Sequence, residues 1–235
     1  MAGGPEKLTL ELSRWLDQHF DHRPEYRSRT PHRGRVFAPA HGLLAGFLVL
    51  REIYAVPLRR LAAYDSAVGW LAVRPARVED AAQMARVNVR SWQETYRGLM
   101  SAAVLDDPGL VAARERFWTA ALSDERYREN RVAVAERDGE LVGIAMSGPP
   151  LDPGAAWVRQ LYVLYVHAAD HGTGAGLALL DAVLDPEEWV VLWVADPNPR
   201  AQGFYRKHGF VADGTTQVEG GVREIRMVRG VQHCR

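Results

Sequence analysis

The sequence has very little cysteine. Its 235 residues include a single one, Cys234, so no disulfide can form within the chain and no cluster of cysteines can hold a metal. Such a chain suits a reducing compartment. The N-terminal residues MAGGPEKLTLELS also lack the basic start and the apolar core of a secretory signal. We therefore expect a cytoplasmic protein.

A net charge and a long apolar run are missing as well. Lys plus Arg and Asp plus Glu number 29 each, so no overall field of either sign favours nucleic acid or an acidic membrane. The most apolar run, residues 42–50, is too short to span a bilayer. It is more typical of a helix packed on a domain than of one lying on a membrane surface. We expect neither nucleic acid nor a membrane among the partners.

The first 69 residues differ in texture from the rest of the chain. A possible helix over residues 8–20 is followed by residues 22–35, where Pro and Arg dominate. This basic stretch could contact RNA or phosphate, but a solvated linker is the simpler interpretation. We expect an N-terminal extension at residues 1–69, partly helical, of unknown role and with the character of a flexible segment. A folded domain is expected at residues 70–230.

Within that domain, helical and strand patterns alternate. Residues 131–137 and 140–148 form a predicted hairpin, since Asp138-Gly139 favours a tight turn with positive φ angles. The other predicted strands are 70–76, 156–166, 189–195 and 222–228, and the predicted helices are 78–98, 110–122, 177–184 and 199–209. A hairpin followed by alternating helices and strands indicates an α/β (α+β) fold with a mixed sheet.

A glycine-rich segment, His171 to Gly176, lies between a predicted strand and a predicted helix. Glycines let the backbone curl around a ligand, and the free N–H groups of a helix start favour phosphate. A dinucleotide-binding unit is the competing interpretation, because Asp196 ends the next strand. However, Leu177 occupies the position of its third glycine, and four residues separate the strand from the loop.

These residues carry a family resemblance. The run QLYVLYVHAADHGTGAGLALL resembles the core motif of the GCN5-related N-acetyltransferase (GNAT) family, with the match at His171, Gly174 and Gly176. The run ADPNPRAQGFYRKHGF is similar to the family's second motif, matched by Asn198, Phe204, Tyr205, Gly209 and Phe210. RSWQETYRGLM and EIRMVR look like its first helical region and its closing strand. The resemblance extends from about Trp70 to Arg229 in the family's order.

The resemblance implies a fold and an activity. The expected fold is a GNAT-type mixed, mostly antiparallel central sheet flanked by helices. The expected activity is an N-acetyltransferase that moves an acetyl group from acetyl-CoA, as acyl-donor cosubstrate, to a primary amine of a small molecule or of a protein N-terminus or Lys. Members often dimerise, so the resemblance leaves open whether the partners include a second copy of this chain, as a homodimer. The alternative is a non-catalytic acyl-CoA sensor with a partner-binding N-terminal extension, and a nucleotide-dependent oxidoreductase is a minor third.

The resemblance also implies the roles of site residues. The backbone of Leu164, Tyr165 and Val166 would pair with the pantetheine arm of acetyl-CoA. His171, Gly172, Thr173, Gly174, Ala175 and Gly176 would hold the pyrophosphate. Asn198 would cap a helix and contact the pantetheine, and Tyr205 would give a proton to the leaving thiolate.

Two departures from the family pattern leave the base open. Gln160 stands where many relatives carry a Glu on the central strand, and His171 stands where Arg or Gln is commoner. A water chain or Glu94 could then deprotonate the amine. Trp92 and Tyr96, four residues apart on one helix, either wall the acceptor pocket or fill the core. His167 and His208 belong to no set with ligand spacing, so we predict no metal.

Overall fold

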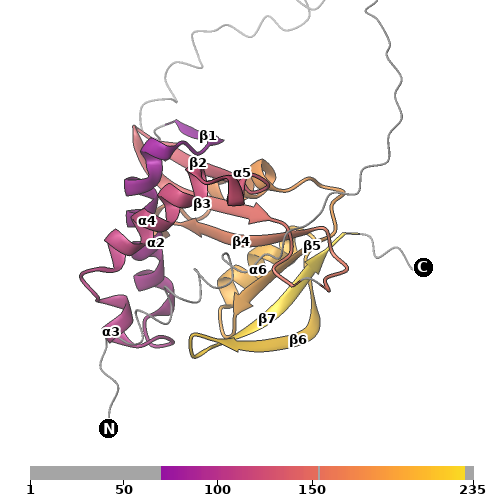
Figure 1. Cartoon of the computed structure of the whole chain (residues 1–235). Coiled ribbons are helices and arrows are strands. Elements are labelled where there is room, and N and C mark those ends of the chain that lie inside the picture. Colours follow the sequence, from indigo (N-terminus) through magenta and orange to yellow (C-terminus); the bar gives the residue numbers. More distant parts are fainter. Residues whose placement is uncertain (1–69, 153, 231–235) are drawn as a thin grey trace, which may run out of the picture. The chain divides into compact units, whose positions relative to one another are not determined.

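The computed structural model describes residues 70–152 and 154–230 (Figure 1). The predictions for the extension at residues 1–69, including its helix and its apolar run, lie outside the described residues. The elements are, in chain order, β1 (Leu71–Pro75), η1 (Val78–Asp80), α2 (Ala81–Tyr96), α3 (Ala102–Leu105), α4 (Leu110–Ser123), η2 (Glu125–Tyr127), β2 (Arg131–Arg137), β3 (Glu140–Gly148), β4 (Arg159–Val166), η3 (Ala168–Asp170), α5 (Ala175–Val183), β5 (Val190–Ala195), α6 (Pro199–Lys207), β6 (Val211–Glu219) and β7 (Val222–Arg229).

The strands form one sheet in the order β1-β2-β3-β4-β5-β7-β6. Only the β4–β5 pair is parallel in this sheet, and the other neighbours are antiparallel. The sheet is therefore mixed and mostly antiparallel, as the resemblance implied. The β2–β3 hairpin is confirmed, with positive φ angles of 53° at Asp138 and 82° at Gly139.

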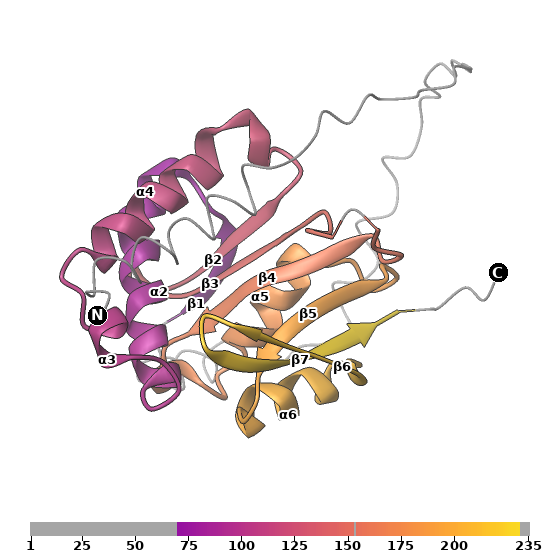
Figure 2. The ribbon, with the colours of Figure 1, turned by 60° about the horizontal axis from the view of Figure 1, so that its bottom comes forward.

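Helices cover both faces of the sheet (Figure 2). Alternation along β2 shows the division, since Val134 packs in the cluster with α2 and α4, whereas Ala133 and Ala135 pack in the cluster with α5 and α6. Side chains that point to one face of a strand thus meet one pair of helices. We name these the α2 face and the α5 face of the sheet.

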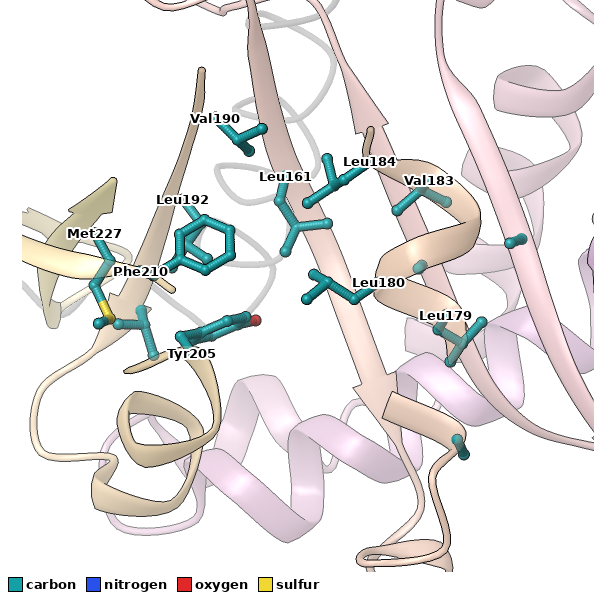
Figure 3. Packing of buried hydrophobic residues seen from close by; sticks show 14 of the residues in the cluster. Leu161, Leu179, Leu180, Val183, Leu184, Val190, Leu192, Tyr205, Phe210 and Met227 are labelled. Carbon is teal, nitrogen blue, oxygen red and sulfur yellow. The ribbon is translucent and has the colours of Figure 1, made fainter. Parts of the chain in front are cut away.

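The α5 face has a close-packed core near the middle of the sheet. Figure 3 shows Leu161 from β4 between Leu180 of α5 and Phe210, which follows α6. Leu192 of β5 belongs to the same cluster. At one end of this core Tyr205 extends from α6. Close approach of α5 depends on Gly143 of β3, where an added Cβ would lie 2.8 Å from the Leu179 side chain. This packing fixes the starts of α5 and α6 against the sheet.

None of the helices within residues 70–152 and 154–230 is long and apolar enough to cross a membrane. Besides the short turns η2 and η3, one helix and one strand of the described residues were not predicted. One is the single turn α3, and the other is the edge strand β6, which pairs only with β7.

Candidate active site

The central strands β4 and β5 separate partway along the sheet. They pair at Arg159↔Val190, Gln160↔Val191 and Leu161↔Leu192 and at no later position among the described residues. Beyond Leu161, residues 162–166 of β4 therefore have no strand beside them on this side. A cleft of about 1190 Å³ opens there, lined by both strands and by α2, α5, α6 and β7.

A β-bulge sets the direction of the side chains in this part of β4. Met146 pairs with Val163 and Ser147 pairs with Leu161, so Tyr162 is an extra residue opposite β3. After the bulge, Leu164 packs on the α5 face and Tyr165 on the α2 face. The bulge thus decides which side chains line each half of the cleft.

The peptide groups of β4 alternate in the same way. The His167 N–H donates to the Val142 carbonyl of β3 at 2.9 Å. Because peptide groups alternate along a strand, those of Tyr165 face β3, and those of Leu164 and Val166 face the open side. The Val166 carbonyl already accepts a hydrogen bond from His171 Nε2 at 2.9 Å. Among the described residues, nothing is hydrogen-bonded to the Leu164 peptide group or the Val166 N–H, so both are left for a ligand.

The glycine-rich loop leads into α5 at the end of this open strand. Gly172 and Gly174 have φ angles of 81° and 94°, a backbone region that favours glycine. The Gly174 carbonyl accepts the first helical hydrogen bond of α5, from Ala178, and no acid lies in the first helical turn. Within the described part of the chain, the N–H groups of residues 174–177 form no hydrogen bond. These N–H groups and the helix dipole make an anion site.

Polar contacts on the protein side hold the loop in place. Thr173 Oγ1 donates to the Asp170 carbonyl at 2.8 Å. The Asp170 carboxylate is largely buried and forms an ion pair with Arg137 of β2. His171 donates from Nε2 to Val166, since a carbonyl oxygen can only accept, and its buried Nδ1 has no partner in the described residues. His171 therefore fixes the loop to the strand end.

Helix α6 borders the cleft opposite the loop. Asn198 Oδ1 caps α6 by accepting from the Ala201 N–H at 3.1 Å, and Asn198 lines the cleft. Phe204 packs against Gly176, where an added Cβ would lie 3.3 Å from the Phe204 ring. Asn198, Gly176 and the other predicted residues of the loop and of β4 thus meet around one opening, apart from Thr173 and Ala175, which support it from the loop and helix backbone.

Tyr205 lies on the same wall and is buried. Its hydroxyl end is directed toward the strand that carries Leu161 (Figure 3), and it forms no hydrogen bond with the described residues. Burial, and after it the nearby Tyr165 hydroxyl, raises the pKa of Tyr205 well above its ordinary value. The phenol is therefore protonated throughout the physiological range.

Glu94 connects α2 with the other end of the opening. Its carboxylate accepts from the Ala168 N–H at 3.1 Å and from Arg90 Nε at 3.0 Å. Burial alone would raise the pKa of Glu94, but these two hydrogen bonds outweigh it and lower the pKa below its usual value. Glu94 lines the cleft as an ionised group with both oxygens engaged.

Aromatic side chains from α2 and β4 form the α2-face wall of the cleft. Trp92 Nε1 donates to the Tyr165 hydroxyl at 2.8 Å, and the Tyr96 hydroxyl lies near enough to that of Tyr165 for each to shift the pKa of the other. All three residues line the cleft. Of the two alternatives for Trp92 and Tyr96, the structure places both at the wall.

Sequence reasoning missed Glu224 of β7, which also lines the cleft. Glu224 pairs with Ala195 of β5 and accepts a hydrogen bond from Gln217 Nε2 of β6 at 2.8 Å. Burial raises the pKa of Glu224, and the Gln217 hydrogen bond opposes this only in part. The alternation in EIRMVR places Glu224 and Arg226 on one face, but the sequence does not tell which face that is.

Two further candidates have structural partners. Asp196, the acid considered for a ribose, forms an ion pair with Arg223. Gln160 Oε1 accepts from the Leu151 N–H at 3.3 Å. Among residues 70–152 and 154–230, no group of three or more His, Cys, Asp or Glu side chains is arranged to hold a metal ion.

Comparisons with known proteins agree with this geometry. The model of the acetyltransferase (GNAT) family matches residues 89–210. The chain is 26% identical over 147 residues to "Probable N-acetyltransferase Rv2775" of Mycobacterium tuberculosis, covering 61% of this chain and 82% of that protein. It is 38% identical over 110 residues to "Uncharacterized N-acetyltransferase Mb2688" of Mycobacterium bovis, covering 42% of this chain and 68% of that protein.

A solved structure shares the fold. PaiA N-acetyltransferase from Thermoplasma acidophilum, determined in complex with coenzyme A, superposes with a TM-score of 0.55 at 19% identity. The match covers 69% of this chain and 99% of that one.

Proposed function

Because the chain belongs to the acetyltransferase (GNAT) family and is an acyltransferase, we propose that it moves an acetyl group from acetyl-CoA to a primary amine. The amine would belong to a small molecule, or to a protein N-terminus or Lys. One observation carries this proposal, namely that the separation of β4 from β5 ends at a loop whose N–H groups are open to an anion. A thioester arm and a pyrophosphate need these two features side by side.

The residues around the opening fit coenzyme A. The Leu164 peptide group and the Val166 N–H would pair with the amides of the pantetheine arm as a neighbouring strand would. Gly172, Gly174 and the first N–H groups of α5 would hold the pyrophosphate, positioned by His171. Asn198 has used its Oδ1 to cap α6, and its amide nitrogen remains to contact the arm. That the Thermoplasma protein was solved in complex with coenzyme A supports coenzyme A as the ligand of this cleft.

The chain's own groups supply positioning and a proton. Acetyl-CoA brings an activated carbonyl carbon, and binding it in the cleft turns a bimolecular attack into a reaction between neighbours. Tyr205 is the proposed acid for the leaving sulfur, because its buried phenol keeps its proton and has no competing partner in the described residues. The Tyr165 side chain lines the cleft on the α2 face, on the other side of the sheet from Tyr205.

The sequence leaves the base as Glu94 or a water chain, and Glu94 stays a prediction. Its place at the cleft favours that role, whereas its two hydrogen bonds and lowered pKa make it a weak base. Replacing Glu94 by Gln tests the prediction directly. An unchanged pH profile of kcat/KM in the Glu94→Gln variant would remove Glu94 from the reaction.

The activity is tested by calorimetric titration with acetyl-CoA and, in parallel, NADH, followed by thiol-release assays. The acceptor panel contains tyramine, spermidine, lysine methyl ester and trialanine. We expect acetyl-CoA to bind, NADH not to bind, and at least one amine to release thiol. Acetyl-CoA binding with no release for any amine would favour the non-catalytic sensor, and absence of acetyl-CoA binding would overturn the proposal.

A further inference from the structure

The cleft has two halves that different groups line. Leu164, Tyr205 and the loop before α5 belong to the α5 face, where the acyl donor is proposed to bind. Tyr165 belongs to the α2 face. A thioester bound in the α5 half leaves the α2 half of the cleft open beside its carbonyl carbon. An incoming amine has to reach it from that side.

Glu224 lies on that side. In the antiparallel β5–β7 pair, Glu224 is opposite Ala195 and Arg226 is opposite Trp193. Met227 of the same strand packs on the α5 face, as does Ile225. Because neighbours in a strand point to opposite faces, Glu224 and Arg226 point to the α2 face. Burial raises the pKa of Tyr165, and the Glu224 charge adds a smaller rise, which agrees with this placement.

Glu224 differs in its partners from Glu94 and Asp170, two other carboxylates at the cleft. Glu94 is paired with Arg90, and Asp170 with Arg137. Within the described part of the chain, Glu224 is in no ion pair, and its hydrogen bond is to the neutral amide of Gln217. A half-buried carboxylate with no cation of its own attracts one from a ligand.

The charged and titratable groups on this side of the cleft come from several elements. Arg114 of α4 lines the cleft, lies over the Trp92 ring and lowers the pKa of Tyr165 in part. Tyr96 from α2 and Tyr165 from β4 are neutral, since the pKa of each is raised. Glu219 from β6 adds a negative charge. Arg226, the next residue on the same face, is paired with Asp213 and lies over the rings of Trp157 and Trp193.

We propose that Glu224 binds the ammonium group of the acceptor and takes its proton. This inference rests on the proposed acetyl transfer. The ammonium gives one proton to the Glu224 carboxylate, and the nitrogen lone pair forms the C–N bond with the acetyl carbon. The C–S bond breaks, the sulfur takes the proton of Tyr205, and the second proton lost by the nitrogen restores Tyr205. Glu224 then releases its proton to water, so one proton is produced for each amide formed.

The geometry favours Glu224 over Glu94 for this step. Both Glu94 oxygens accept strong hydrogen bonds, from the Ala168 N–H and Arg90. One Glu224 oxygen is bonded to Gln217, and the other has no hydrogen bond with the described residues. Burial also raises the pKa of Glu224, which brings the carboxylate nearer to the range in which a base works at neutral pH.

The test compares the full-length wild type with Glu224→Gln, Glu94→Gln and the matched control Glu140→Gln. Glu140 is exposed at the start of β3, outside the cleft. The acceptor is the member of the amine panel with the highest wild-type kcat/KM. Thiol release is measured as a function of pH, and acetyl-CoA affinity is measured by calorimetry for every variant.

We expect Glu224→Gln to lower kcat/KM at pH 7 by on the order of 100-fold, as loss of a general base does. The loss should shrink as pH rises and the amine becomes neutral without help, while acetyl-CoA affinity stays within twofold of wild type. Glu140→Gln should match the wild type. A loss that is the same at every pH, or that comes with an equal loss of acetyl-CoA affinity, would mean that Glu224 is structural.

Activity of Glu224→Gln within threefold of wild type at pH 7 would overturn the inference and leave the transferase standing. A pH-dependent loss in Glu94→Gln alone would assign the base to Glu94. Acetyl-CoA binding without thiol release by the wild type would overturn the proposed function itself, and this inference with it.

Discussion

Trp92 Nε1 donates a 2.8 Å hydrogen bond to the hydroxyl of Tyr165 and so joins α2 to the open part of β4. The Tyr96 hydroxyl lies near enough to that of Tyr165 for each to shift the pKa of the other. Because the Tyr165 oxygen accepts the hydrogen bond from Trp92, its own hydrogen is still available, and Tyr165 lines the cleft.

Replacing Tyr165 by Phe should affect both the stability of the fold and the binding of the acceptor amine. The Trp92 N–H would lose its partner, at a cost of about 1–3 kcal/mol in the free energy of unfolding. The hydroxyl available to the acceptor would change as well, so the acceptor KM should rise. Urea unfolding and thiol-release kinetics measure the two effects. The Tyr96→Phe variant keeps the Trp92 hydrogen bond and should cost less stability. An equal cost in both variants would contradict this account.

Replacing Tyr205 by Phe should lower kcat by on the order of 100-fold, as loss of a general acid does. Acetyl-CoA affinity should change little, because the ring and its packing against Phe210 remain. Tyr127→Phe, outside the cleft, is the control and should match the wild type. A Tyr205→Phe variant with wild-type kcat would exclude the phenol as the proton donor.

The raised pKa of Tyr205 sets the alkaline behaviour of the wild type. Burial, together with the Tyr165 hydroxyl, keeps the phenol protonated above the ordinary tyrosine pKa of about 10. Rising pH increases the fraction of neutral amine and does not remove the acid. The rate of the wild type should thus reach a plateau with no decline up to about pH 10. A decline between pH 8 and pH 9 in thiol release would contradict a protonated Tyr205 as the acid.

The sequence predicted the elements that bury a regular apolar pattern. Helix α2 buries Ala81, Met84 and Ala85 at helical spacing, and the hairpin turn at Asp138 carries its own local signal. Strand β6 was not predicted, because it buries no regular apolar pattern. Its Val211 and Val218 are 62% and 70% exposed, so this edge strand has no buried face to produce alternation.

The sequence predicted those site residues that belong to a pattern of neighbouring residues. A glycine loop before a helix and an Asn cap are patterns of neighbouring residues, and the structure brings Gly174 and Asn198 to the same cleft. Glu224 depends on long-range order instead. It reaches the cleft because β7 inserts between β5 and β6. The direction of Tyr165 similarly depends on the bulge at Tyr162, which no local pattern announces.

Replacing Gly174 by Ala should weaken both the fold and coenzyme A binding. The φ angle of 94° is unfavourable for a residue with a Cβ, by about 1–2 kcal/mol. If the loop shifts to relieve this strain, an N–H donor to the pyrophosphate is lost, and the dissociation constant should rise by roughly tenfold or more. Thermal unfolding and calorimetry measure the two effects.

The matched control is Gly203→Ala on α6. Gly203 has open space around it and lies outside the cleft. Alanine in a helix interior is more stable than glycine by roughly 0.5–1 kcal/mol, so this variant should unfold at a higher temperature. The two Gly→Ala changes should shift the unfolding temperature in opposite directions, and shifts in the same direction would contradict the role of the Gly174 backbone.

Replacing Asp170 by Asn should loosen the loop from β2. Its carboxylate and the Arg137 guanidinium are only 9% and 20% exposed, so removing one charge leaves the other poorly solvated. The expected cost is on the order of 3 kcal/mol in the free energy of unfolding, with weaker coenzyme A binding. Asp185→Asn, which removes a 63% exposed partner of Arg131, should cost within about 1 kcal/mol. Equal costs in the two variants would show that Asp170 does not anchor the loop.

The pKa of Glu224 makes a last prediction, about stability. Because burial raises this pKa, the ionised carboxylate is less stable in the folded chain than in the unfolded one. The contribution of Glu224 to stability is full below the unfolded pKa of about 4.3 and is lost as pH rises through the folded pKa. Glu224→Gln should therefore gain stability relative to wild type between pH 4 and pH 7.

Urea unfolding of wild type, Glu224→Gln and Glu140→Gln at both pH values measures this gain. Glu140→Gln should differ from wild type by the same small amount at pH 4 and at pH 7. If the Glu224→Gln difference is also independent of pH, the carboxylate is not destabilised by burial. The expected result is that Glu224→Gln becomes more stable relative to wild type as pH rises, although this variant has lost activity. The Glu224 charge would then weaken the fold at neutral pH and serve the reaction, which is the expected trade-off for a residue kept as a base.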